Sequence, residues 1–167
     1  MNNQSKIQIL IERIVANVPA EQLMHGIEGL DVNEVNIHGR TPLMVAAAKG
    51  LLAAVEMLVR NGASIRATGS VEMTALHEAS ANGEAVVANY LLSLGADVDA
   101  ETIQGVTPLM CAAAWGYTEV AKLLLENHAD PAKTDHTGAT AADIAGEKGE
   151  DETADLIHSF ASRRGAE

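Results

Sequence analysis

The side chains of this 167-residue chain best suited to metal binding, acid–base catalysis or nucleophilic attack belong to six histidines and one cysteine. The histidines are His25, His38, His77, His128, His136 and His158. None of them pairs with a cysteine, a carboxylate or another histidine at the spacing typical of a zinc site. No GxxxxGK(S/T) phosphate-binding loop is present either. These patterns predict no metal site, no cofactor and no catalytic centre, so we do not expect an enzyme.

The single cysteine, Cys111, lies in an alanine-rich stretch, which predicts a buried and inert thiol. One cysteine cannot form an internal disulfide, which fits a reducing compartment. The apolar run Ile7–Val15 is broken by Gln8 and Glu12, so it lacks the pattern of a signal peptide. No stretch is long and apolar enough to span a bilayer. We therefore expect a soluble, cytoplasmic protein that does not bind membranes.

The amino-acid composition and net charge limit which folds and which classes of partner are expected. Aromatic residues make up only 2 % of the chain, while apolar residues make up 47 %. The core must therefore be built from Ala, Leu, Val, Ile and Met, which favours closely packed helices. The formal net charge of −12 repels phosphate backbones, so nucleic acid is not the expected partner.

The elements that must position any functional residue come from an internal repeat. Four segments, starting at threonines spaced 33 residues apart, align without a gap. They are TPLMVAAAKG from Thr41, TALHEASANG from Thr74, TPLMCAAAWG from Thr107 and TAADIAGEKG from Thr140. Each threonine is suited to cap a helix, and the alanines keep that helix thin. The final glycine ends the helix, since it accepts a left-handed backbone.

A second helix follows in each of the first three segments, with an apolar face such as Val55, Leu58 and Val59. Gly62 and Gly95 end this helix in the first two segments. The third segment has His128 at this place, which we interpret as a C-cap residue that tolerates positive φ rather than as a ligand.

A period of 33 residues with a Thr-Pro-Leu-His-like start resembles the ankyrin-repeat family. The resemblance implies an all-α solenoid of about five stacked helix-turn-helix units with short β-turn fingers. One domain is expected over residues 1–167, made of an N-terminal capping unit, three full repeats, a C-terminal capping unit and a flexible tail. Their predicted bounds are 1–35, 36–68, 69–101, 102–134, 135–160 and 161–167. His77 falls at the family's TPLH histidine, so we expect it to hydrogen-bond between units.

The terminal units are expected to be atypical, since each must bury one face and expose the other. In the N-terminal unit we predict helices over Ser5–Asn17 and Pro19–Glu28, with the apolar face of the second on Leu23, Met24 and Ile27. At the other end, the segment Glu147–Asp155 holds five acids and one base. We interpret this segment as a solvated cap, with a partner site as the alternative.

In the ankyrin family the partner usually binds the fingertips and the concave groove. Because the fingertip residues vary from unit to unit while the helix skeleton repeats, they are free to take part in recognition. The predicted partner-binding residues are Ile37, His38, Arg40, Lys49, Val71, Met73, Asn82, Ile103, Gln104, Val106, Trp115, Tyr117, His136 and Lys148. The finger of the second unit has Glu72 where the other fingers have glycine, so its turn is expected to differ.

Trp115, with Tyr117 beside it, is the predicted interface hot spot. The opposing interpretation is that Trp115 lies flat over alanines and only fills the groove. The predicted function is a monomeric protein-binding module, an adaptor, inhibitor or regulator of an unknown partner protein. Two alternatives stay open: a regulatory subunit of an enzyme complex, and a homo-oligomer formed through the apolar fingertip residues.

Overall fold

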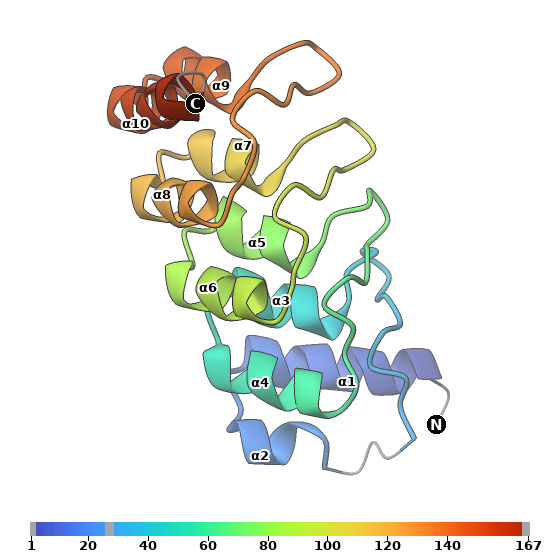
Figure 1. The fold of residues 1–167 in the computed structure, drawn as a ribbon. Helices are drawn as coiled ribbons and strands as arrows, with labels where there is room; N and C mark the ends of the chain where they lie inside the picture. The colour runs from blue at the N-terminus through green and yellow to red at the C-terminus, as the bar shows by residue number, and fades with distance from the viewer. Residues whose placement is uncertain (1–2, 26–28, 165–167) are drawn as a thin grey trace.

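In the part of the chain that the structure describes, the helices follow one another in five consecutive pairs, each joined by a short turn (Figure 1). This computed structural model describes residues 3–25 and 29–164, and only the backbone of Asn3 and Arg164. The helices are α1 (Asn3–Val15), α2 (Ala20–Leu23), α3 (Pro42–Ala48), α4 (Leu52–Arg60), α5 (Ala75–Ala81), α6 (Ala85–Ser93), α7 (Pro108–Ala113), α8 (Thr118–Glu126), α9 (Ala141–Lys148) and α10 (Asp151–Arg164). Within these described ranges no strand is formed, and one isolated β-bridge joins Thr134 and Thr140. The predicted all-α solenoid is confirmed.

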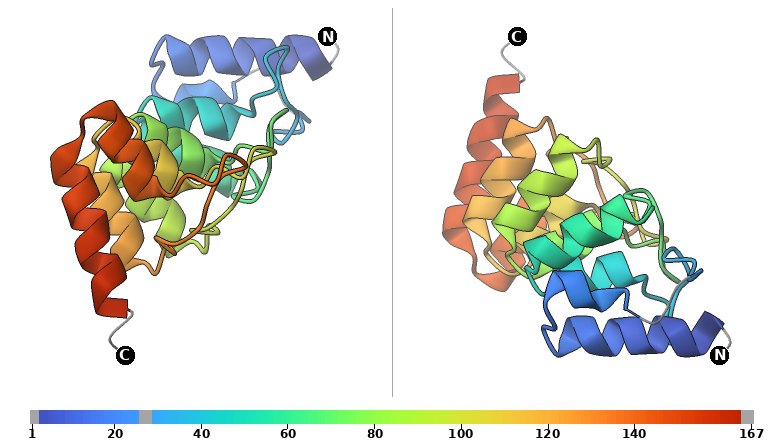
Figure 2. Two further views of the ribbon diagram at one scale, coloured as in Figure 1. Left: turned by 90° about the horizontal axis from the view of Figure 1, so that it is seen from above. Right: turned by 90° about the horizontal axis from the view of Figure 1, so that it is seen from below.

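The odd-numbered helices form an inner row and the even-numbered helices an outer row, and each helix packs against its neighbours in the row. Between successive pairs the chain projects as a hairpin-like finger, and the fingers lie together on one side of the stack (Figures 1 and 2). Each helical pair thus makes its main contacts with the pairs before and after it, as expected of a solenoid.

The inner helices α3, α5, α7 and α9 each begin after a threonine whose hydroxyl accepts the backbone N–H three residues later. The residue at that third position reaches back to the threonine's own N–H. Met44 and Met110 do so with sulfur at 3.4 Å, His77 with Nδ1 at 3.2 Å and Asp143 with a carboxylate oxygen at 2.9 Å. Three different side chains therefore close the same capping box, and the starts of the inner helices stay in register.

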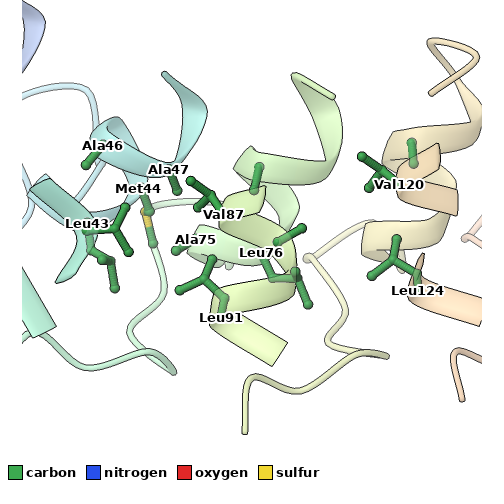
Figure 3. Packing of buried hydrophobic residues seen from close by; sticks show 14 of the residues in the cluster. Leu43, Met44, Ala46, Ala47, Ala75, Leu76, Val87, Leu91, Val120 and Leu124 are labelled. Carbon is green, nitrogen blue, oxygen red and sulfur yellow. The ribbon is translucent and has the colours of Figure 1, made fainter. Parts of the chain in front are cut away.

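The core lies between the two helical rows (Figure 3). Ala46 and Ala47 on α3, like their counterparts on α7, are completely buried, so the inner helices can approach one another closely. The outer helices contribute larger side chains, and Leu58, Leu91 and Leu124 are also completely buried. Burying one such leucine is worth about 1.5–3 kcal/mol, so the stack is stabilised by the same contact repeated from unit to unit.

The turns that end the helices use a left-handed backbone. Gly62 and Gly95 have φ angles of +89° and +83°, and His128 has +72° at the equivalent place. The prediction that His128 is a C-cap residue with positive φ is confirmed. Asn17 takes the same role after α1, with φ +54°.

The N-terminal unit differs from the prediction. The first helix is α1, Asn3–Val15, rather than Ser5–Asn17, and the second is the single turn α2 rather than a helix over Pro19–Glu28. The guanidinium of Arg13 donates to the carbonyls of Leu23 (2.9 Å) and His25 (2.6 Å), which satisfies acceptors at the end of α2 without another helical turn. Of the predicted apolar face, Leu23 is fully buried and Met24 is partly buried against the core, and Ile27 lies outside the described residues.

At the C-terminus, α10 continues to Arg164 and so includes residues 161–164, the start of the segment predicted as a flexible tail. Thr153, Ala154 and Ile157 face the core, and the acids at the start of this helix are exposed, as a solvated cap requires. Among the helices that the structure describes, none has the length and apolar character needed to cross a membrane.

Candidate functional site

Three of the four fingers are tight turns held by a side chain at their first residue. In the first finger the amide oxygen of Asn36 accepts the N–H groups of His38 (2.9 Å) and Arg40 (3.0 Å). Thr102 and Asp135 accept the equivalent N–H groups in the third and fourth fingers. Asn, Thr and Asp favour such turns because their short polar side chains reach the backbone two residues on.

The second finger lacks this side-chain acceptor, because Gly69 stands at its first position. A Cβ atom on Gly69 would lie 2.4 Å from the carbonyl oxygen of Gly39, so only glycine fits against the first finger. Glu72, at the position that is glycine in the other fingers, has φ +61°. The different turn expected from Glu72 is thus a left-handed residue under strain rather than a new path of the chain.

Neighbouring fingers are joined through their backbones. The N–H of Ser70 donates to the carbonyl of Gly39 (3.0 Å), and the N–H of Ile103 donates to the carbonyl of Val71 (3.2 Å). The N–H of His136 donates to the carbonyl of Gln104 (2.9 Å). The four fingers therefore form one continuous row beside the inner helices.

The predicted fingertip residues divide into two groups. Ile37, with 83 % of its surface accessible, is the most exposed large apolar residue of those that the structure describes, and Val71 and Ile103 are also exposed. His38, Gln104 and His136 are exposed as well. Met73 and Val106 are only partly exposed, and Val106 packs against the core. The exposed apolar surface of the fingers therefore comes from Ile37, Val71 and Ile103.

A second set of predicted residues lines the ends of the inner helices. Lys49, Asn82, Trp115 and Lys148 occupy equivalent positions in four consecutive units, and all four are exposed. Trp115 has 66 % of its surface accessible, so most of the residue is in contact with solvent. This row carries two ammonium groups, an amide and an indole, a combination suited to contacting another protein.

Tyr117 belongs to the packing of the stack rather than to this row. It is partly buried against the core and lies over the turn at Gly83, where an added Cβ would come within 2.7 Å of its ring. Tyr117 therefore covers the junction between the second and third units.

An ion pair that the sequence reasoning missed crosses from the first finger to the second unit. Arg40 Nε lies 2.7 Å from Glu78 Oε1, and Glu78 is largely buried. Burial raises the pKa of the Glu78 carboxyl, and the Arg40 guanidinium opposes that shift. The available signal was Glu78 itself, because the equivalent residues Val45, Cys111 and Ile144 are all apolar.

Cys111 follows Glu78 along this line of inner-helix residues, and although the residue is partly exposed, its thiol is largely buried, as predicted. Burial of the sulfur raises the pKa of the Cys111 thiol to about 12, and the nearby Glu78 carboxylate adds to the rise. The thiol is therefore protonated at neutral pH, and the predicted lack of reactivity has a physical cause.

His77 links two units, as the resemblance implied. Its Nδ1 accepts the N–H of Thr74, so its Nε2 carries the proton and donates to the carbonyl of Val106 at 3.0 Å. The ring is completely buried, and burial lowers the pKa of His77 below its usual value of 6.5. His77 is thus a neutral structural residue.

A hollow of about 450 Å³ opens between α1, the first finger and α3. Its apolar wall contains Ile11, Val15 and Val45, and His38 and Arg40 lie on the finger side. The residues from α1 were not predicted, because their place in the groove follows only from how α1 packs against α3. Among the described residues, no cluster of three or more His, Cys, Asp or Glu side chains could hold a metal ion.

Comparison with known proteins matches this chain to a protein family. The family model of ankyrin repeats, which spans three copies, matches residues 7–102, 53–135 and 100–162. A search of curated proteins found no match. The family match covers both capping units as well as the central repeats.

Proposed function

Because this chain belongs to the ankyrin-repeat family, whose repeats are generally protein–protein interaction modules, we propose that it binds a partner protein through its fingers and inner-helix ends. The binding would be that of an adaptor, inhibitor or regulator: a preformed surface captures the partner and blocks or localises it. The family is typically non-catalytic, and this proposal needs no chemistry from the chain itself.

One observation carries the proposal. The skeleton of the repeat is nearly constant, yet the exposed positions at the ends of the inner helices read Lys49, Asn82, Trp115 and Lys148. Packing does not require these differences, because all four side chains are exposed. An exposed tryptophan in the same row as two lysines can supply a large contact area together with charge, which is typical of residues that dominate interfaces.

The test compares two exposed apolar residues on opposite faces. Trp115→Ala removes the proposed hot spot, and Val86→Ala is the matched control, since Val86 is 68 % exposed on the outer helix α6. Both variants should melt at nearly the wild-type temperature. Partner proteins captured from the source cells and identified by mass spectrometry should be retained by Val86→Ala and lost by Trp115→Ala. For a purified partner, we expect the dissociation constant to rise about 30-fold or more.

Equal retention by the two variants would contradict the assignment of Trp115. The exposed Ile37, Val71 and Ile103 favour one other function, self-association through the fingers. Light scattering over a dilution series distinguishes the two, because a partner-binding monomer keeps a constant mass.

A further inference from the structure

The row of fingers has an open end at the first finger. In the second, third and fourth fingers, the residue after the first turn position donates its N–H to the preceding finger. Those donors are Ser70, Ile103 and His136, and Ile37 is the equivalent residue of the first finger. Among the described residues no finger precedes it, because residues 3–7, which lie one repeat before the first finger, belong to the helix α1.

Ile37 is the unpaired donor of its finger. The N–H of Asn36 donates to the carbonyl of Arg40, and the N–H of Gly39 donates to the carbonyl of Asn36. The N–H groups of His38 and Arg40 both donate to the Asn36 side chain. Within residues 3–25 and 29–164, the N–H of Ile37 has no such partner. By the translation that relates the fingers, it points to where an earlier finger would lie.

The hollow described above lies on this same side of the first finger, between it and α1. Ile11 and Val45 form its floor, and Val15 remains 52 % exposed at its wall. Its volume of about 450 Å³ is large enough for a bulky apolar side chain. An unpaired backbone donor and an apolar hollow therefore lie side by side at the N-terminal end of the groove.

We propose that this end of the molecule binds an extended segment of the partner protein, which continues the row of fingers. A backbone carbonyl of that segment accepts the N–H of Ile37, as Gly39 accepts that of Ser70, and an adjacent large apolar side chain fills the hollow. The occupant is extended rather than helical, because the carbonyls of a helix are already used within the helix except in its last turn. This inference rests on the proposed protein-binding function and names the kind of segment bound.

A pair of substitutions isolates the hydrogen bond. Ile37→Ala and Ile37→Pro both remove the side chain, but only proline removes the N–H. Ile37 is the second residue of a turn closed by the Gly39 N–H to Asn36 carbonyl bond of 2.8 Å, a position that proline favours. Ile37→Pro should therefore melt no lower than Ile37→Ala. Ile103→Pro, which breaks the bond to Val71, should melt below Ile103→Ala.

The binding probe is a displayed library of random linear peptides, selected on the wild-type protein. We expect selected peptides to bind Ile37→Pro roughly three- to tenfold more weakly than Ile37→Ala. They should also lose affinity for Val15→Ser and keep it for the control Val86→Ser. A measurement on the wild type does not depend on whether a variant folds. In the wild type, the bound peptide should slow hydrogen exchange of the Ile37 amide.

Equal binding to Ile37→Pro and Ile37→Ala, or an unprotected Ile37 amide in the complex, would overturn the inference. So would the recovery of no binding peptide. Peptides that depend on Trp115 but not on Ile37 or Val15 would overturn it while leaving the proposed function intact. Loss of partner capture in both Trp115→Ala and Val86→Ala would count against the proposed function instead.

Discussion

Replacing Glu72 by glycine should stabilise the protein. Glu72 has φ +61°, where a residue with a Cβ is destabilised by about 1–2 kcal/mol. Glycine removes that strain but gains about 0.5–1 kcal/mol of conformational entropy in the unfolded chain. The bond from the residue 72 N–H to the Gly69 carbonyl (3.0 Å) is kept, because it involves only the backbone. We therefore expect the free energy of unfolding to rise by about 0.5–1 kcal/mol, or about 1–4 °C in melting temperature.

Two further variants separate backbone strain from charge. Glu72→Ala removes a negative charge from an acidic protein but keeps the strained φ, so its stability should stay within about 0.5 kcal/mol of wild type. Gly138 has φ +87° in the fourth finger and no atom within 4 Å of an added Cβ, so Gly138→Ala introduces backbone strain alone. It should lower stability by about 0.5–1 kcal/mol. Urea unfolding followed by circular dichroism measures all three. A gain in Glu72→Ala equal to that in Glu72→Gly would refute the strain argument.

Three other perturbations follow from buried polar groups. The Ser80 hydroxyl is completely buried with no hydrogen-bond partner in the described structure, and the equivalent residues of two other units are Ala47 and Ala113. Ser80→Ala should therefore raise the free energy of unfolding by about 1 kcal/mol, as measured by urea titration. His77 has a lowered pKa in the native state, so the unfolded chain takes up its proton first as the pH falls below 6.5. The free energy of unfolding should therefore decrease as the pH falls. His77→Met, which introduces the residue found at the equivalent positions Met44 and Met110, should lessen this decrease when unfolding is compared at neutral and mildly acidic pH. The pKa of Cys111 is about 12, against 9.0 for a free thiol, so its thiolate is about a thousandfold rarer in the native protein. Iodoacetamide should therefore alkylate the native protein far more slowly than the urea-unfolded chain, which mass spectrometry can follow.

The repeat made most of the fold predictable, because the residues that begin and end the helices recur at equivalent positions in each unit. Thr41 and its three counterparts begin helices where the capping pattern predicts, and the left-handed His128 was recognised from the glycines at equivalent positions. The N-terminal unit was less predictable. The length of α2 depends on Arg13 contacting the carbonyls of Leu23 and His25, a contact between two helices that no local pattern records.

The candidate site was predictable by position but not by contact. Counting along the repeat placed Ile37 and Trp115 on exposed surface, whereas Val106 and Tyr117 occupy similar counted positions and pack against the core. The Arg40–Glu78 ion pair joins residues from different units. Such a pair depends on the distance between units, which the sequence does not state.

The sequence by itself determined the number of units, the start of the inner helices and the positions whose side chains differ from unit to unit, because these follow from periodicity and local backbone preferences. The tertiary structure decided which of those side chains are exposed, which pack against the core and which contact one another. Only the stacking of α1 against α3 creates the hollow at Val15, and only the rise from one unit to the next joins the fingers and leaves the N–H of Ile37 at their open end. These features depend on rigid-body packing between units, and so they are not encoded in any single repeat.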